Sequence, residues 1–328
     1  MTNRFSSHTK TIVRGLLTAV ALATAYSGSA SAINVTTYHY DNFRSGWNPN
    51  ETALTPASVA GGNFGVLANV IATGDIGAQP LIVQNVTIAK KGTHDVVYIV
   101  TDTNEVEAFD ATTGQKLVSV NLGPTPPTDT FPNPTQVGIQ STPVIDIAQN
   151  AMFLITCTYE NNLPVYRLHK LSLSTLGNMT QAVAIRASTK LVNGKLVQFQ
   201  TYAERQHPAL LEANGNIYAA FGSFSDLAQT VSRGWLLGWN ATTLAPLPAN
   251  SVMNNRSALN GTCNRYRTGP CFLSSIWMSQ FGVAADASGN LFLVTGNSEP
   301  GTYGPPNNLQ ESAVKLSGDL TQVLDIFT

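Results

Sequence analysis

The chain has 328 residues, of which only 11% are charged, and its formal net charge at neutral pH is −1. A chain this poor in basic residues has no electrostatic footprint for nucleic acid or for an anionic lipid surface. Its length is enough for one large domain or two ordinary ones.

The first 32 residues are expected to be an export signal. Arg4, Lys10 and Arg14 make a basic start, residues 15–25 are apolar or small, and Ala30-Ser31-Ala32 follows as a cleavage signal. This order of segments is typical of a secretory leader, and the apolar run is shorter than the roughly twenty residues that span a bilayer. Cleavage after Ala32 removes three basic and no acidic residues, which takes the net charge from −1 to −4. We therefore expect residues 33–328 to be exported to the periplasm or the extracellular space, with no membrane span.

The cysteines fit an oxidising compartment. Cys263 and Cys271 are close in the sequence and are expected to form a disulfide. Cys157 lies in an apolar run and is expected to be a buried thiol. Since no CxxC pair or tight His/Cys cluster occurs, the sequence predicts no metal site.

From residue 78 onward one pattern of short strands is repeated, near 78–122, 141–185, 207–247 and 281–327. Each copy opens with a short apolar strand, continues with a second strand that carries an aromatic residue, and has a third strand that ends in a tight turn. An outer strand follows. The aromatic residues are Tyr98, Phe153, Tyr218 and Phe292, and the polar turn residues are Asp110, Ser172, Asn240 and Ser317. Short polar side chains suit such turns because they can bond backbone amides.

A single four-stranded sheet cannot cover both of its faces, so the copies must pack on one another around an axis. The sequence therefore predicts an all-β fold for residues 33–328, a β-propeller of four-stranded antiparallel blades. About four blades are legible, either as a four-bladed propeller or as part of a six- to eight-bladed one. A β-sandwich with evenly spaced strands is the alternative.

The start of each innermost strand of a propeller faces the central channel, and polar residues precede these strands here. The ligand-binding candidates are Gln79, Gln140, Arg205, His207, Trp277 and Gln280. Glutamine amides can donate and accept together, and Trp277 could stack on a flat ligand. In the alternative interpretation these side chains only satisfy backbone groups at the channel mouth.

A second group of chemistry-capable residues lies near the N-terminus. His39 and Asp41 could act as a base and the residue that orients it. Asp41 and Arg44 could equally form a surface ion pair that fastens the N-terminal segment. No catalytic residue is assigned from the sequence.

Several segments resemble the repeat of the pyrroloquinoline-quinone-type, or quinoprotein alcohol dehydrogenase-like, β-propellers. They are 97–100, 105–117, 138–146, 167–171, 276–279 and 284–290. The resemblance runs from about Tyr38 to the end of the chain and implies the propeller fold. In periplasmic alcohol and sugar dehydrogenases of this family, pyrroloquinoline quinone sits at the centre of the propeller with a calcium ion. Those enzymes commonly have an adjacent-cysteine disulfide over the quinone and about eight blades, whereas this chain has neither an adjacent cysteine pair nor more than four legible blades. The resemblance therefore leads us to expect a truncated member of the family that lacks its later blades, with a four-bladed propeller as the alternative.

Two functions from different classes follow. The first is a secreted propeller that acts as a binding or scaffold module, with an unknown small molecule or protein at its rim and no confidently assigned cofactor. The alternative is a periplasmic oxidoreductase of the alcohol or sugar dehydrogenase type, dependent on pyrroloquinoline quinone and calcium.

Overall fold

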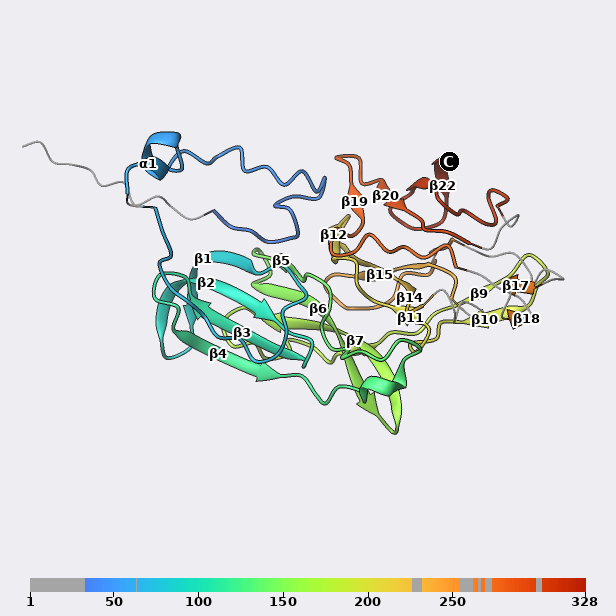
Figure 1. The fold of residues 1–328 in the computed structure, drawn as a ribbon, viewed down its shortest axis with the longest axis horizontal. Coiled ribbons are helices and arrows are strands. Elements are labelled where there is room, and N and C mark those ends of the chain that lie inside the picture. The colour runs from blue at the N-terminus through green and yellow to red at the C-terminus, as the bar shows by residue number, and fades with distance from the viewer. Residues whose placement is uncertain are drawn as a thin grey trace, which may run out of the picture. The chain divides into compact units, whose positions relative to one another are not determined.

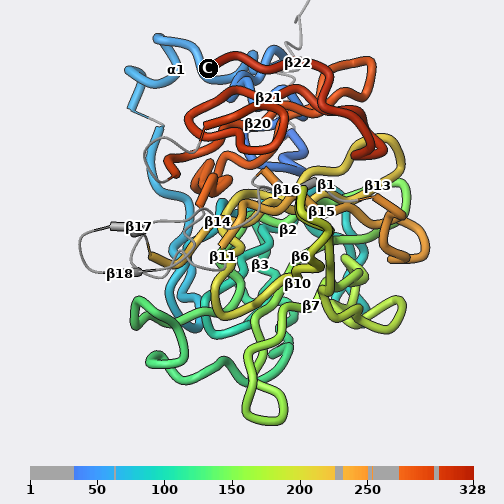
Figure 2. Tube along the Cα trace, turned by 90° about the vertical axis from the view of Figure 1, so that its right-hand side faces the viewer, coloured from blue at the N-terminus to red at the C-terminus, as the bar shows by residue number. Residues whose placement is uncertain are grey.

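The computed structural model describes residues 33–62, 64–225, 232–249, 251–253, 262–264, 267–268, 273–298 and 303–328. Almost all regular structure in these residues is β (Figures 1 and 2). No helix among them is long and apolar enough to cross a membrane. The predicted leader and Cys271 lie outside the described residues, and only the backbone of Cys263 is described, so the leader and the disulfide stay predictions.

Four antiparallel sheets of four strands each follow one another along the chain, and we call them blades 1 to 4. Blade 1 contains β1 (Leu81–Ile88), β2 (Gly92–Val100), β3 (Glu105–Asp110) and β4 (Lys116–Asn121). Blade 2 contains β5 (Val144–Asp146), β6 (Ala151–Glu160), β7 (Leu163–Ser172) and β8 (Val183–Ala184). Blade 3 contains β12 (Leu211–Ala213), β13 (Asn216–Ala220), β15 (Trp235–Asn240) and β16 (Ser251–Val252). Blade 4 contains β19 (Ala284–Ala285), β20 (Leu291–Val294), β21 (Ala313–Leu316) and β22 (Val323–Phe327).

The remaining elements are short; in chain order they lie before blade 1 or between blades, except β14, which lies between two strands of blade 3. They are α1 (Pro56–Ala60), the 3-10 turn Thr128–Thr130, β9 (Ser188–Lys190), β10 (Leu196–Gln198), β11 (Glu204–Arg205), β14 (Gly222–Ser223), β17 (Thr262–Asn264) and β18 (Arg267–Thr268). The four predicted copies of the strand pattern each correspond to one blade, so the predicted fold class is confirmed.

The core lies between neighbouring blades, because strands expose alternate side chains on opposite faces. In β13, Ile217 and Ala219 pack towards blade 2, whereas Tyr218 and Ala220 pack towards blade 4. One apolar cluster fills each of the junctions between blades 1 and 2, 2 and 3, and 3 and 4. Each inner blade therefore buries both of its faces, which explains why its strands are apolar at nearly every position.

The aromatic residue of each copy lies on the face directed towards the next blade in the chain, which we call the front face. Tyr98, Phe153 and Tyr218 are almost fully buried in the junctions that follow them. Phe292 occupies the same position in blade 4 and is 38% exposed. The repeated aromatic is thus the residue that packs one blade on the next.

The polar turn residues after the third strands act as the sequence predicts. The Oδ1 atom of Asp110 accepts from the amides of Thr112 (2.9 Å) and Thr113 (2.7 Å). Asn240 accepts in the same way from the amides at 242 and 243, at 3.0 and 2.9 Å. These side chains satisfy amides that the strand ladder leaves unpaired.

An N-terminal arm, residues 33–48, runs along the innermost strands. The backbone of Val35 pairs with Ile82 of β1 through hydrogen bonds of 2.8 and 3.0 Å. The carbonyl of Thr36 accepts from the amide of Ile145 in β5 at 2.8 Å. The arm therefore bridges blades 1 and 2 at their inner edge.

Arg44 extends the arm to the other two blades. Its Nη2 donates to the carbonyl of Leu210 before β12 (2.9 Å), and its Nε donates to the carbonyl of Val283 before β19 (3.2 Å). Its Nη1 donates to Thr37 and Tyr38 within the arm at 2.5 and 3.1 Å. Burial lowers the pKa of the Arg44 guanidinium to about 10, so the group stays charged at neutral pH.

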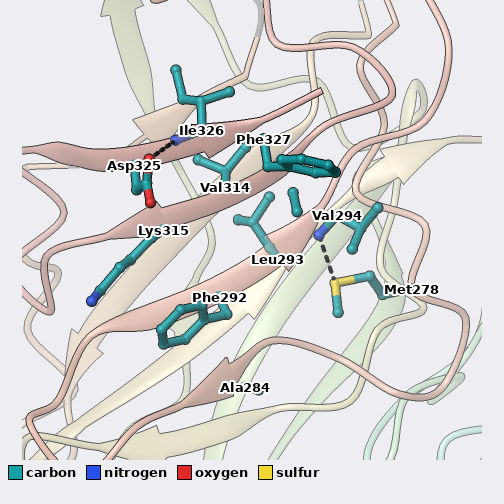
Figure 3. Close-up of a pocket in the computed structure, with 11 residues that line it drawn as sticks. Met278, Ala284, Phe292, Leu293, Val294, Val314, Lys315, Asp325, Ile326 and Phe327 are labelled. Carbon is teal, nitrogen blue, oxygen red and sulfur yellow. Dashed lines mark hydrogen bonds between the residues drawn. The ribbon is translucent and has the colours of Figure 1, made fainter.

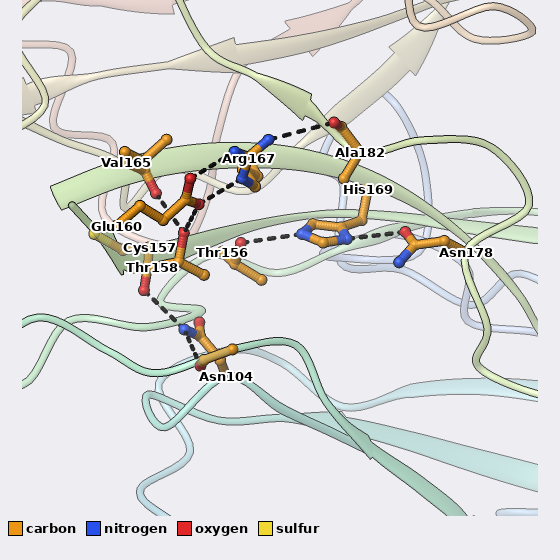
Figure 4. Close-up of polar contacts among 11 residues, drawn as sticks. Asn104, Thr156, Cys157, Thr158, Glu160, Val165, Arg167, His169, Asn178 and Ala182 are labelled. Carbon is orange, nitrogen blue, oxygen red and sulfur yellow. Dashed lines mark hydrogen bonds and ion pairs between the residues drawn. The ribbon is translucent and has the colours of Figure 1, made fainter. Parts of the chain in front are cut away.

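Figure 4 shows the polar contacts around the buried Cys157, most of which lie within blade 2, together with the Asn104 contact that joins blade 1 to blade 2. The expectation that Cys157 is a buried thiol is confirmed. Asn104 Nδ2 donates to the Cys157 carbonyl at 2.7 Å. Nearby, His169 makes hydrogen bonds with Thr156 (3.1 Å) and Asn178 (2.9 Å). Burial lowers the His169 pKa and raises that of the Cys157 thiol, so both groups are neutral and structural.

Candidate functional site

The segments that precede the innermost strands meet at the inner edge of the blades, and we call this meeting place the channel mouth, after the feature expected from the sequence. Gln280 Nε2, before blade 4, donates to the carbonyl of Gly77, before blade 1, at 2.7 Å. Arg205 Nε, before blade 3, donates to Gln140 Oε1, before blade 2, at 3.0 Å. Side chains far apart in the sequence are thus brought together, as the propeller fold requires.

The three glutamines of the mouth bond mainly to backbone groups. Gln79 Oε1 accepts from the amide of His39 (3.3 Å), and Gln140 Nε2 donates to the carbonyl of Gln136 (2.9 Å). The Nε2 atom of Gln280 is engaged by Gly77. These amides hold the entering segments in place, which matches the alternative interpretation made from the sequence.

Arg205 is a charged residue of the mouth whose guanidinium uses only one of its nitrogen atoms, Nε, in a described hydrogen bond. It lies in β11, which pairs with β14 so that Arg205 is directly opposite Gly222. Its guanidinium stacks over the ring of Phe224, with 5.8 Å between the guanidinium carbon and the ring centroid. Nε is bonded to Gln140, and among the described residues neither Nη atom has a hydrogen-bond partner. Burial lowers the Arg205 pKa, and among the described residues no carboxylate forms an ion pair with the group.

Trp277 lies on the same side of β14 as Arg205. The indole packs closely on two glycines. If Gly222 were alanine, its Cβ would lie 3.4 Å from Cδ2 of the indole, and the Cβ of an alanine at 296 would lie 3.2 Å from Cδ1. Residues opposite each other in an antiparallel pair share a face, so the Arg205 side chain and the Trp277 indole flank the same bare backbone at Gly222. Trp277 is half-buried. The two glycines leave room for a large flat side chain between blades 3 and 4.

His207 is half-buried near Arg205, and no described residue makes a hydrogen bond with its ring. Burial and then the charge of Arg205 lower the His207 pKa to about 4. The imidazole is therefore neutral at physiological pH and can either donate or accept a hydrogen bond.

The three residues proposed from the N-terminal motif have separate surroundings. The His39 ring stacks on Tyr38 with a centroid distance of 4.2 Å and meets Phe281 edge-on at 4.8 Å. The Asp41 carboxylate accepts from the amide and the hydroxyl of Ser45. The Asp41 amide donates to the His39 carbonyl at 2.9 Å, but no described contact joins the Asp41 carboxylate to the His39 ring. No described ion pair joins Asp41 to Arg44, whose guanidinium is buried against blades 3 and 4. Only His39, through Gln79, belongs to the mouth.

Glu204 is a buried carboxyl group that the sequence analysis did not single out. It accepts from the Arg233 amide (2.9 Å) and from the Ser232 hydroxyl (3.2 Å), and it is fully buried. Burial raises its pKa to about 8 despite these hydrogen bonds. Alternation along β11 puts Glu204 on the face opposite Arg205, so it lies beneath the mouth. A lone Glu in a short irregular strand carries no pattern that would predict its burial.

The described residues contain no group of three His, Cys, Asp or Glu side chains placed to hold a metal ion. The carboxylates of Glu204, beneath the mouth, and of Asp41, in the arm, each accept hydrogen bonds from their own neighbours. Within this part of the chain the mouth is a cationic and aromatic site.

Comparison with known protein families and with curated proteins finds no match. Among solved structures, the chain is similar to the quinohemoprotein alcohol dehydrogenase ADHIIG from Pseudomonas putida HK5, with a TM-score of 0.59 and 16% identity over 90% of this chain. It is also similar to the quinohemoprotein alcohol dehydrogenase from Comamonas testosteroni, with a TM-score of 0.58 and 14% identity over 90% of this chain. The chain has a β-propeller fold. It spans 40% and 41% of the lengths of those two proteins.

Proposed function

We propose that this propeller is a binding module that takes a flat, anionic organic ligand at the channel mouth. The observation that carries the proposal is that Arg205 and Trp277 lie on the same face of the backbone at Gly222. The free Nη atoms of Arg205 suit a carboxylate, which guanidinium groups bind in a bidentate manner. The half-buried indole offers an aromatic face to a planar ring.

Pyrroloquinoline quinone is the ligand of this class that the sequence resemblance implies. It is planar and carries several carboxylates, so the cation, the indole and the glycines of the mouth fit its organic part. Calcium requires six to eight oxygen ligands, usually with carboxylates among them, and the described residues supply no such group. We therefore propose quinone binding without deriving a redox step.

Oxidoreductase activity of the alcohol or sugar dehydrogenase type is the second candidate. The observation in its favour is the fold shared with two quinohemoprotein alcohol dehydrogenases. A shared fold at 14–16% sequence identity does not show that two proteins share an activity. The two candidates make the same prediction for quinone binding and differ in turnover.

Titration of the protein with pyrroloquinoline quinone, followed by calorimetry and by the melting temperature, tests the proposal. Binding to the native state raises the melting temperature. Trp277→Ala and Arg205→Gln should each weaken binding by at least about tenfold, or ~1.4 kcal/mol. Trp47→Ala is the matched control, because Trp47 is 68% exposed on the N-terminal arm, and it should leave the affinity unchanged.

The titration is repeated with calcium and with a primary alcohol plus an artificial electron acceptor. Binding without turnover supports the binding module, and calcium-dependent turnover supports the dehydrogenase. Equal affinity for the quinone in the wild type and in both mouth variants would place any binding elsewhere and would overturn the proposed site.

A further inference from the structure

The guanidinium of Arg205 is held in place by two contacts of different kinds. It lies over the ring of Phe224, with 5.8 Å between the guanidinium carbon and the ring centroid. Its Nε donates to Gln140 Oε1 at 3.0 Å. A guanidinium is planar and presents its N–H groups in a fixed fork. Two contacts of this kind therefore also fix where its other two nitrogen atoms lie.

The ring of Phe224 is in turn packed by Phe131, which comes from the proline-rich loop 124–136 between blades 1 and 2. The two rings stack with a centroid distance of 4.3 Å and an angle of 23° between their planes. Both are almost fully buried and belong to the apolar cluster between blades 2 and 3. The Arg205 cation thus contacts a ring whose position is fixed by the core.

The same loop orients the amide that accepts from Arg205. Gln140 Nε2 donates to the carbonyl of Gln136 at 2.9 Å, which leaves the carboxamide oxygen for Arg205 Nε. Because Nε is engaged, a carboxylate that binds the guanidinium in a bidentate manner must use the two Nη atoms. Neither Nη atom has a hydrogen-bond partner among the described residues. The loop therefore leaves one edge of the guanidinium for a ligand.

Both contacts that hold Arg205 are uncharged. Phe224 contributes an aromatic ring and Gln140 a neutral amide, and none of the described ion pairs includes Arg205. A half-buried cation without a counter-ion is costly to keep, and an anion that reaches it gains strong charge-assisted hydrogen bonds. The mouth therefore favours a ligand that brings its own negative charge.

The hollow on the front face of blade 4 is a different kind of place. Figure 3 shows its side chains, which are mostly apolar and surround about 300 Å³. Its two charged residues, Lys315 and Asp325, have opposite charges and lie directly opposite each other on β21 and β22. The mouth instead combines a cation that has no described ion pair with the indole of Trp277. A ring that carries a carboxylate is therefore expected at the mouth.

We propose that the mouth selects an aromatic carboxylate, which Arg205 binds end-on through both Nη atoms while the aromatic ring stacks on Trp277. The inference rests on the proposed function and narrows its flat anionic ligand to one whose carboxylate is attached directly to the ring. In such a ligand the carboxylate and the ring form one rigid unit, so the Nη pair also sets how the ring meets the indole. Phe224 and Gln140 are then positioning residues, which act on the ligand through Arg205.

Calorimetric titration of the exported chain with naphthalene-2-carboxylate tests the ligand class. The comparison ligands are the saturated decahydronaphthalene-2-carboxylate and the neutral naphthalene-2-carboxamide. The wild type should bind the aromatic carboxylate at least about tenfold more tightly than either, because the first cannot stack and the second forms no charge-assisted pair. Arg205→Gln should abolish the preference for the carboxylate over the carboxamide. An unchanged affinity in this variant would place the ring elsewhere, as in the hollow of Figure 3, and would overturn the proposal.

Substitution of Phe224 tests the positioning role. Phe224→Leu should weaken carboxylate binding about fivefold and leave carboxamide binding unchanged, because it removes the ring beneath the cation. Phe224→Tyr keeps the ring and should restore the wild-type preference. Phe199→Leu is the matched control, since Phe199 packs on Phe221 and Trp235 in the same cluster and has no described contact with Arg205. A merely structural role would weaken both ligands alike.

The NMR signal of the Arg205 Nε–H group, identified by its loss in Arg205→Gln, measures the positioning without any ligand. Its exchange with water should be slow in the wild type and in Phe199→Leu, and faster in Phe224→Leu. Equal exchange in these two variants would overturn the positioning role. A wild type that binds pyrroloquinoline quinone but does not prefer the naphthalene carboxylate would overturn this inference alone. A wild type that binds none of these ligands would overturn the proposed function with it.

Discussion

At the scale of single residues, Glu212 and Asp146 share a hydrogen bond across the boundary between blades 2 and 3. Burial, and then the charge of Asp146, raise the Glu212 pKa to about 7. Burial also acts to raise the Asp146 pKa, but hydrogen bonds from Gln149 outweigh it and leave that pKa below its ordinary value. The pair thus holds one proton at mildly acidic pH, on Glu212.

This pair should make the folded state less stable as the pH rises. The unfolded Glu212 ionises near its ordinary pKa of 4.5 and the folded one near 7, so between these values the folded state binds more protons and stability falls with pH. Glu212→Gln keeps a neutral hydrogen-bond donor to Asp146. We expect it to match the wild type at pH 4 and to be more stable by about 1 kcal/mol at pH 8, allowing for partial solvent screening.

Urea unfolding at several pH values measures the effect. Asp325→Asn, a change on exposed β22, is the control and should follow the wild-type pH dependence. A Glu212→Gln variant with the same pH slope as the wild type would show that the carboxyl pair does not share a proton.

At the scale of elements, the blade junctions depend on the repeated aromatic and on one polar contact each. Tyr98 fills the junction between blades 1 and 2, and its hydroxyl donates to the Leu173 carbonyl at 2.8 Å. Burial raises the Tyr98 pKa, so the hydroxyl remains a donor over the whole accessible pH range. Phe153 has no hydroxyl, and in its junction Lys170 supplies the contact instead.

Tyr98→Phe should lower the free energy of unfolding by about 1–2 kcal/mol, because it removes a buried hydrogen bond and leaves the Leu173 carbonyl without this donor. The ring and its packing are retained, so no cavity contributes to the loss. Tyr202→Phe is the matched control, since Tyr202 is 44% exposed, and it should change stability by less than about 0.5 kcal/mol. Equal unfolding midpoints for the two variants would contradict a structural role for the Tyr98 contact.

At the scale of the whole molecule, the N-terminal arm links the inner edges of all four blades. Val35 and Thr36 bond to blades 1 and 2. Asn42 donates to the carbonyl of Glu212 in blade 3 at 2.8 Å and accepts from the Ala285 amide in blade 4 at 2.8 Å. Contacts between segments this far apart in the sequence stabilise an arrangement that each blade alone cannot maintain.

Arg44→Ala should destabilise the protein by about 2–4 kcal/mol, because four carbonyl or hydroxyl oxygens lose a charged donor at the inner edge. Blades 3 and 4 should separate from the arm first, which would appear in calorimetry as a broader unfolding transition. Lys195→Ala, on an exposed turn, is the control. A variant at Arg44 that unfolds as sharply and at the same temperature as the wild type would show that the arm is dispensable.

The sequence by itself determined the blades, because each depends on local signals: apolar alternation, an aromatic on the second strand, and a polar residue such as Asp110 or Asn240 at the turn. It also indicated that polar residues precede the innermost strands. It did not indicate which of these side chains make hydrogen bonds within the protein, because their partners come from other blades. Gln280, for example, donates to the carbonyl of Gly77, which is 203 residues earlier in the sequence.

Only the tertiary structure decided how the side chains of the candidate site are arranged. His39, Asp41 and Arg44 are neighbours in sequence, yet packing around the axis separates their side chains into an aromatic stack, a local turn and a buried bridge. Trp277 and Arg205 lie on one face only because both are beside Gly222 in the folded chain. Phe292 repeats the pattern of Tyr98 but is 38% exposed, because no described segment packs on that face of blade 4. The physical reason is that strand and turn formation depend on neighbouring residues, whereas burial and polar pairing depend on which blade faces which.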